Sequence, residues 1–177
     1  MTHRDHVHLL RGGIAEPGGT WADFGSGSGA FTLALRELAG ADAEIFSIDK
    51  DGARLREQER AFAEMFPNSR VQFLRADFTR ELKLPALDGI VMANALHFFK
   101  NKIDVLHRAR EFLKPRGVLL LVEYNVDAGN IWVPHPLSFE TFCELAPRAG
   151  FTLPRLLATS PSHFLREFYS ALTARAT

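Results

Sequence analysis

The sequence predicts an α/β domain built on an open, mostly parallel, doubly wound sheet. From residue 20 onward, short apolar strands alternate with amphipathic helical segments, which is the pattern of βαβ units. The segment Val118–Val122 is continuously apolar, as expected for a strand that helices cover on both faces. A glycine-rich turn also joins the first strand to the first helix, where such sheets bind ligands.

The composition predicts one cytoplasmic domain with no nucleic-acid or membrane partner. The chain has 177 residues, and Lys plus Arg equals Asp plus Glu at 21 each, so no basic excess favours nucleic acid. Its single cysteine, Cys143, excludes an internal disulfide and fits a reducing compartment. No apolar run is long enough to span a bilayer, and the N-terminus lacks an apolar signal segment. The composition predicts no particular oligomeric state.

The glycine turn follows an apolar strand that begins at Thr20 and ends near Phe24. Glycines stand at alternate positions, Gly25, Gly27 and Gly29, and a helix follows. Glycine is needed where the backbone bends unusually or where a ligand must approach it closely. Because the first N–H groups of a helix have no partner within it, this turn predicts a cofactor site.

Two cofactor classes fit the turn. Gly25, Gly27 and Ala30 match the dinucleotide pattern G-x-G-x-x-G/A, and an acid that could hold a ribose follows at Asp49. However, Asp23 at the strand end would repel a diphosphate and attract an ammonium or sulfonium group. S-adenosylmethionine carries both cations, so the charge favours it over a nicotinamide dinucleotide.

The run Asp23–Gly29 resembles the glycine motif of class I S-adenosylmethionine-dependent methyltransferases. The resemblance covers residues 20–177 and implies a Rossmann-like sheet of seven strands in the order 3-2-1-4-5-7-6, with an antiparallel C-terminal hairpin. It also implies direct methyl transfer from the sulfonium to a nucleophile on a small-molecule acceptor, an EC 2.1.1 activity. The alternatives are a non-catalytic regulatory protein that binds S-adenosylmethionine and, less favoured, an NAD-dependent oxidoreductase.

Residues 1–19 form a short N-terminal segment with at most one helix, around Asp5–Arg11. Three histidines at positions 3, 6 and 8 invite a metal site, but spacing alone is a poor guide to metal ligands, so we interpret the segment as a solvated terminus and predict no metal. The segment is also the only N-terminal material that could close over a ligand as a lid.

The next elements follow from periodicity and strand ends. Apolar residues at positions 31, 34, 35 and 38 predict a helix, and residues 45–48 predict a strand that Asp49 closes. A second helix runs from about residue 52 to Phe66, with a charged face that we interpret as solvated. Asp49 can accept hydrogen bonds from both hydroxyls of a ribose, and Lys50 beside it joins the predicted cofactor site.

A third strand around Val71 and Phe73 precedes Asp77 and Phe78. The resemblance implies that the acid at this point accepts the amino group of adenine and that the apolar neighbour packs on the ring. The alternative for Asp77 is a simple turn or helix-cap aspartate.

The fourth strand, residues 87–93, is followed by Asn94-Ala95-Leu96-His97. Base-methylating relatives carry Asn/Asp-Pro-Pro-aromatic here, so this sequence resembles the small-molecule branch, which includes quinone-biosynthesis enzymes. Asn94 is implied to lie near the methionine moiety. His97 is a general base, a substrate contact or a structural histidine, since imidazole titrates near neutral pH.

Residues 105–113 predict a helix that a turn at Lys114–Gly117 ends, before the apolar strand that leads to Tyr124. The long loop 125–137 is typical of a binding loop, in which Trp132 and His135 could wall a pocket for a flat or apolar acceptor. Trp132 could equally plug the core.

Ser138 is expected to cap a helix that Pro147 interrupts near its end and that buries Cys143. Two final strands, 151–159 and 163–172, complete the hairpin, and Pro154 suits an edge strand.

The predicted site has two parts. The cofactor-binding residues are Asp23, Gly25, Ser26, Gly27, Gly29, Asp49, Lys50, Asp77, Phe78 and Asn94. If the acceptor is a hydroxyl, a base is needed, and the sequence offers His97, Tyr124 and His135 without ranking them.

Overall fold

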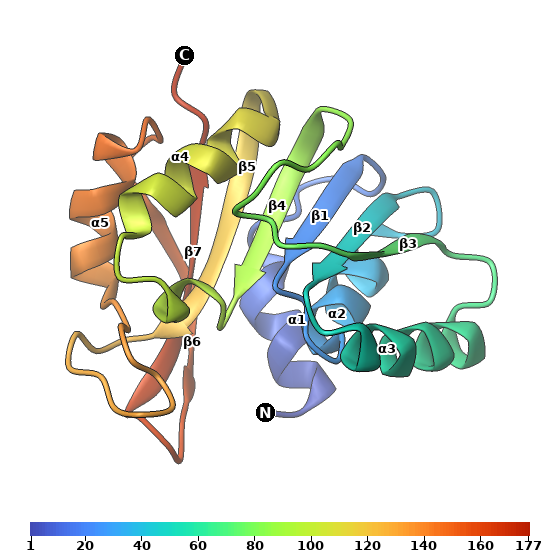
Figure 1. Ribbon diagram of the computed structural model, residues 1–177, viewed down its shortest axis with the longest axis horizontal. Coiled ribbons are helices and arrows are strands. Elements are labelled where there is room, and N and C mark those ends of the chain that lie inside the picture. The colour runs from blue at the N-terminus through green and yellow to red at the C-terminus, as the bar shows by residue number, and fades with distance from the viewer.

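A computed structural model describes all residues from 1 to 177 (Figure 1). Its single seven-stranded sheet has the order β3-β2-β1-β4-β5-β7-β6, which confirms the predicted topology. The strands are β1 Thr20–Phe24, β2 Glu44–Asp49, β3 Arg70–Arg75, β4 Leu87–Ala93, β5 Leu113–Tyr124, β6 Arg155–Pro161 and β7 Glu167–Ala174. Strands β1 to β5 pair in parallel, whereas β7 is antiparallel to both β5 and β6.

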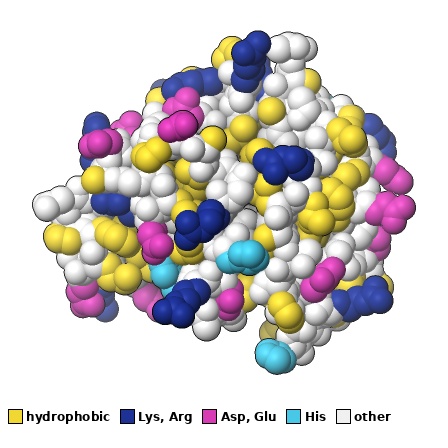
Figure 2. Space-filling view, turned by 180° about the vertical axis from the view of Figure 1, so that it is seen from behind, with side chains coloured by type: hydrophobic (Ala, Val, Ile, Leu, Met, Phe, Trp, Pro, Cys, Tyr) yellow, Lys and Arg dark blue, Asp and Glu magenta, His cyan; other side chains and the backbone are white.

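Helices cover both faces of this sheet. They are α1 His3–Arg11, α2 Ala30–Ala39, α3 Gly52–Met65, α4 Lys102–Phe112 and α5 Phe139–Arg148, with a 3₁₀ turn at Leu96–Phe98. One buried cluster joins the sheet to α4 and α5, and a second joins it to α1 and α2. No helix is both long enough and apolar enough to cross a bilayer. On the face seen in Figure 2, acidic and basic side chains are interspersed without a large patch of one sign.

The N-terminal segment is packed onto the domain and is not a solvated terminus. Thr2 and Asp5 form a capping box at the start of α1, and the apolar face of the helix lies against α2 and β6. Leu9 and Leu10 are completely buried, which ties the helix to the core. A role of this segment as a lid stays a prediction.

Three boundaries differ most from expectation. The predicted turn at 114–117 lies inside β5, which begins at Leu113; there Arg116 adopts φ +65° and the register with β4 shifts, so the turn is a bulge within a strand. The first hairpin strand begins at Arg155, because Phe151 makes only an isolated bridge. The second begins at Glu167, four residues after the expected start at His163.

The parallel strands bring four predicted site segments to one edge of the sheet. The glycine turn follows β1, Asp49 ends β2, Asp77 follows β3 and Asn94 follows β4. Since the carboxyl ends of adjacent parallel strands share an edge, side chains from distant parts of the chain meet there.

Candidate functional site

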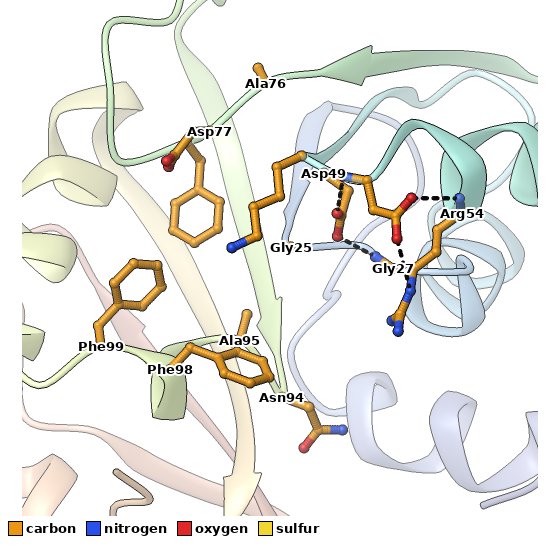
Figure 3. A pocket seen from close by; sticks show the side chains of 13 residues that line it. Gly25, Gly27, Asp49, Arg54, Ala76, Asp77, Asn94, Ala95, Phe98 and Phe99 are labelled. Atoms are coloured by element: carbon orange, nitrogen blue, oxygen red, sulfur yellow. Dashed lines mark hydrogen bonds and ion pairs between the residues drawn. The ribbon is translucent and has the colours of Figure 1, made fainter. Parts of the chain in front are cut away.

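A cavity of about 350 Å³ opens at the carboxyl ends of β1 to β4 (Figure 3). This volume lies within the range of small-molecule sites, which is roughly 300–1,000 Å³. Its lining residues are Gly25, Gly27, Asp49, Lys50, Asp51, Arg54, Ala76, Asp77, Phe78, Asn94, Ala95, Phe98 and Phe99.

The glycine turn forms one wall of the cavity. Gly25 has φ +77°, and a Cβ added there would lie 2.8 Å from the Cβ of Ala95 on the opposite wall. A side chain at this position would therefore fill the space between the turn and the end of β4. Glycine keeps this space open for a ligand.

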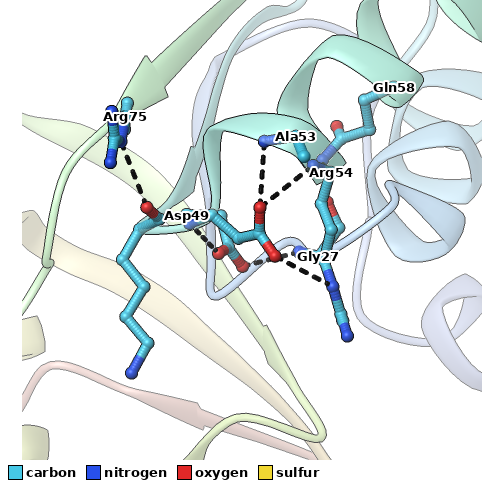
Figure 4. A network of polar contacts seen from close by, with 8 residues as sticks. Gly27, Asp49, Ala53, Arg54, Gln58 and Arg75 are labelled. Atoms are coloured by element: carbon cyan, nitrogen blue, oxygen red, sulfur yellow. Dashed lines mark hydrogen bonds and ion pairs between the residues drawn. The ribbon is translucent and has the colours of Figure 1, made fainter.

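Asp49 presents a prepared pair of acceptors. One carboxylate oxygen accepts the backbone N–H of Gly27 at 2.8 Å, and the other accepts that of Asp51 at 2.8 Å (Figure 4). Because each carboxylate oxygen can accept about two hydrogen bonds, each keeps one site free. Two neighbouring oxygens with one free site apiece can accept the two hydroxyls of a ribose.

Asp77 and Phe78 line the cavity beyond the end of β3. Asp77 accepts hydrogen bonds from both the hydroxyl and the backbone N–H of Thr79, and the hydroxyl in particular lowers the pKa of this carboxyl. It is therefore a turn aspartate that also faces the cavity. The Phe78 ring stacks on Phe24, with centroids 5.1 Å apart, and offers a flat apolar wall.

Asn94 carries an unsatisfied group at the cavity wall. Its backbone adopts φ +52°, and its side-chain oxygen is enclosed without a hydrogen-bond partner. A buried acceptor without a partner costs about 1–3 kcal/mol. Because this oxygen is enclosed, it does not by itself identify a ligand in the cavity.

Asp23 lies behind the turn, outside the cavity lining. Asp23 is only 1% exposed, and the hydroxyl of Thr32 donates a hydrogen bond to its carboxylate at 2.6 Å. Burial raises the pKa of this carboxyl to about 7. The carboxylates that face the cavity are those of Asp49, Asp51 and Asp77, so a contact between Asp23 and a cationic ligand stays a prediction.

The structure brings together seven of the ten predicted cofactor residues. Gly25, Gly27, Asp49, Lys50, Asp77, Phe78 and Asn94 line the cavity, whereas Asp23, Ser26 and Gly29 do not. Sequence reasoning missed Arg54, because it lies on the helix face that was interpreted as solvated. It also missed Phe98 and Phe99, although they directly follow the predicted site segment after β4, a position that could have identified them.

The three candidate bases differ in their surroundings. Nδ1 of the buried His97 lies 2.8 Å from a carboxylate oxygen of Glu123, which is completely buried. The other Glu123 oxygen accepts the backbone N–H groups of Leu96 and His97 at 3.0 and 3.1 Å. Nε2 of His97 has no partner and is not among the fully enclosed polar atoms. Glu123 was not predicted as a cofactor-binding residue or as a base, although it directly follows the apolar run 118–122 near the end of β5.

Tyr124 is less suited to accept a proton. Burial raises the pKa of the Tyr124 hydroxyl, which therefore keeps its proton at neutral pH. The backbone N–H of His135 donates to the carbonyl of His97 at 3.0 Å, so this loop residue lies beside the turn that carries His97. Trp132 is 71% exposed and does not plug the core.

Comparison with known proteins identifies the domain. A family model described as a methyltransferase domain matches residues 22–119, which contain most of β1, the glycine turn and all of β2 to β4.

Two curated relatives match part of their own length. Acetylserotonin O-methyltransferase from Mus musculus is 32% identical over 158 residues, which are 87% of this chain and 38% of that protein. Carboxy-S-adenosyl-L-methionine synthase from Pseudomonas syringae is 33% identical over 130 residues, which are 67% of this chain and 51% of that protein. The chain thus spans about half or less of these relatives.

A solved structure shares the fold over nearly the whole chain. Magnesium protoporphyrin IX methyltransferase (ChlM) from Synechocystis, with S-adenosylmethionine bound, has a TM-score of 0.74 at 15% identity. The match covers 98% of this chain and 78% of that chain.

Proposed function

Because this chain belongs to the class I S-adenosylmethionine-dependent methyltransferases, we propose that it methylates a hydroxyl group on a planar aromatic small molecule. S-adenosylmethionine is the methyl donor of the family, and the cavity residues suit it. The observation that carries the proposed acceptor is the buried His97–Glu123 pair, which lies beside the cavity wall at Phe98.

Different cavity residues would bind different parts of the cofactor. The free acceptor sites of Asp49 would hold the ribose hydroxyls, and the flat Phe78 wall would pack on the adenine. Asn94, which also lines the cavity, would lie near the methionine moiety. When bound, S-adenosylmethionine supplies an electrophilic methyl group, and the protein needs chiefly to align an acceptor with it.

His97 is suited to take the acceptor's proton. A carboxylate can only accept, so Glu123 fixes the proton of the imidazole on Nδ1 and leaves a lone pair on Nε2. The acceptor's hydroxyl proton would pass to Nε2 as its oxygen bonds to the methyl carbon and the carbon–sulfur bond breaks. The products are a methyl ether, S-adenosylhomocysteine and a protonated imidazole, whose positive charge Glu123 stabilises.

Aromatic side chains surround this base. Phe98 is 61% exposed and its ring centroid lies 4.3 Å from that of His97, while Tyr124 lies 6.1 Å away. Beyond Tyr124, at another 6.1 Å, stands Phe164, which is 50% exposed. Exposed rings arranged around a base favour a planar apolar acceptor.

The acidity of the acceptor's hydroxyl group also favours an aromatic acceptor. A phenolic hydroxyl ionises near pH 10, far closer to the range of imidazole than an aliphatic alcohol. Proton transfer to His97 is therefore much easier from an aromatic hydroxyl.

The test is transfer of a labelled methyl group from S-adenosylmethionine to matched acceptors. We expect turnover with phenols and naphthols, and none with the corresponding cyclohexanols or anilines. Preferred methylation of the amines or alcohols would overturn the proposed acceptor. Binding of S-adenosylhomocysteine without turnover of any acceptor in the panel would favour the regulatory alternative.

A further inference from the structure

Gln58 is a completely buried polar residue on α3, a helix that otherwise buries Leu55 and Phe62. A buried amide costs free energy unless its hydrogen bonds are made. Here three are made. The side-chain nitrogen donates to the hydroxyl of Ser26 at 2.9 Å and to the carbonyl of Gly27 at 2.8 Å, and the side-chain oxygen accepts the Ser47 hydroxyl at 2.7 Å.

Gly27 is therefore held from both sides. Its N–H belongs to one peptide plane and donates to Asp49, while its carbonyl belongs to the next plane and accepts from Gln58. Fixing both planes fixes φ and ψ of this residue, which has φ +57°. The orientation of the Gly27 N–H, in turn, sets which lone pairs of Asp49 remain free toward the cavity.

The side chain of Gln58 packs closely against the backbone of Gly29. A Cβ added to Gly29 would overlap the Cγ and amide carbon of Gln58. The turn and the α3 side chain thus occupy fully complementary space, although they lie 29 or more residues apart in sequence.

From these contacts we infer that Gln58 is a positioning residue for the cofactor, which acts through Gly27 to orient the carboxylate of Asp49. It does not line the cavity and does not touch the ligand. The inference concerns the cofactor alone and does not depend on the identity of the methyl acceptor.

The test compares Gln58→Leu and Gln58→Glu with Gln72→Leu, which changes the only other glutamine, on the exposed surface of β3. Glutamate has the size of glutamine but, when ionised, lacks both N–H donors. In isothermal titration of folded protein with S-adenosylhomocysteine, we expect both Gln58 variants to bind about tenfold more weakly, as for one or two lost hydrogen bonds. Gln72→Leu should bind as the parent does.

A double-mutant cycle separates positioning from a loss of general stability. If Gln58 acts through Asp49, adding Asp49→Ala to Gln58→Glu should weaken binding by less than the product of the two single effects. With Asp77→Ala, at the other side of the cavity, the single effects should multiply. Unchanged affinity in both folded Gln58 variants, or simple multiplication with Asp49→Ala, would overturn the inference. Failure of the parent to turn over phenols would overturn only the proposed acceptor.

Discussion

Nδ1 of His97 lies 2.8 Å from the carboxylate of Glu123, across the ends of two neighbouring parallel strands. Both side chains are buried, and the same carboxylate accepts two backbone N–H groups of the turn that carries the histidine. Glu123 therefore holds the position of the imidazole, and in the proposed mechanism it also accepts the Nδ1 proton.

Glu123→Gln should abolish most methyl transfer while the cofactor still binds. An amide at this position can donate to Nδ1, which forces the ring proton onto Nε2 and removes the lone pair that accepts the acceptor's proton. We expect kcat to fall by about 10²–10⁴-fold, the usual contribution of general base catalysis. The dissociation constant of S-adenosylhomocysteine, measured by calorimetry, should change little. A kcat near that of the parent would exclude His97 as the base.

The acceptor site should depend on Phe164, which lies outside the cofactor cavity. Phe164→Ala removes one aromatic contact of about 0.5–1.5 kcal/mol, so KM for a phenolic acceptor should rise about two- to tenfold. KM for S-adenosylmethionine should stay constant. Leu153→Ala is the matched control, because Leu153 is another strongly exposed apolar residue and lies just before β6. Equal effects of both substitutions would contradict an acceptor site at Phe164.

The buried Asp23 predicts a pH-dependent stability. Burial raises the pKa of this carboxyl from 3.8 to about 7, so the folded protein holds the proton over a range in which the unfolded chain has released it. The folded state therefore loses stability as the pH rises from about 4 to about 7, by up to about 4 kcal/mol, and no further loss follows above that range.

Asp23→Asn removes this titration and keeps the shape of the side chain. The difference in free energy of unfolding between Asp23→Asn and the parent, from urea denaturation, should shift in favour of the variant as the pH rises from 4 to 7. Other titrating groups cancel in this difference. A difference that is constant with pH would show that Asp23 is ionised throughout.

The fold could be predicted from the sequence because its signals are local. Apolar periodicity, glycines and strand-end acids specify each element, and the strand order follows once the family is identified. What the sequence could not supply is the direction of individual side chains. Asp23 and Asp49 both lie at strand ends. The carboxylate of Asp23 is bound to the Thr32 hydroxyl and does not line the cavity, whereas Asp49 does line it.

The same limit applies to contacts between distant residues. The pairing of Glu123 with His97 spans 26 residues, and that of Gln58 with Gly27 spans 31, so no local pattern reveals either. A polar residue at the apolar spacing of Leu55 and Phe62 was the one available signal for Gln58.

Alanine substitutions at Gly29 and Gly18 distinguish the cost of backbone strain from the cost of overpacking. Both have φ near +90°, but a Cβ at Gly18 would meet nothing within 4 Å, whereas one at Gly29 would overlap Gln58. Gly18→Ala should cost about 1 kcal/mol from its left-handed backbone alone. Gly29→Ala should cost about 1–3 kcal/mol more from overpacking, measured by urea denaturation. Equal losses of unfolding free energy in the two variants would mean that the Gln58 side chain moves aside without measurable cost.

The most direct test of the account is calorimetric titration of S-adenosylhomocysteine into the parent, Asp49→Ala and the surface control Asp42→Ala. We predict one saturable site in the parent and in the control. In Asp49→Ala, we predict a loss of about 1–3 kcal/mol of binding free energy, because the carboxylate no longer accepts the ribose hydroxyls. No binding to the parent, or the same dissociation constant in Asp49→Ala, would contradict the account.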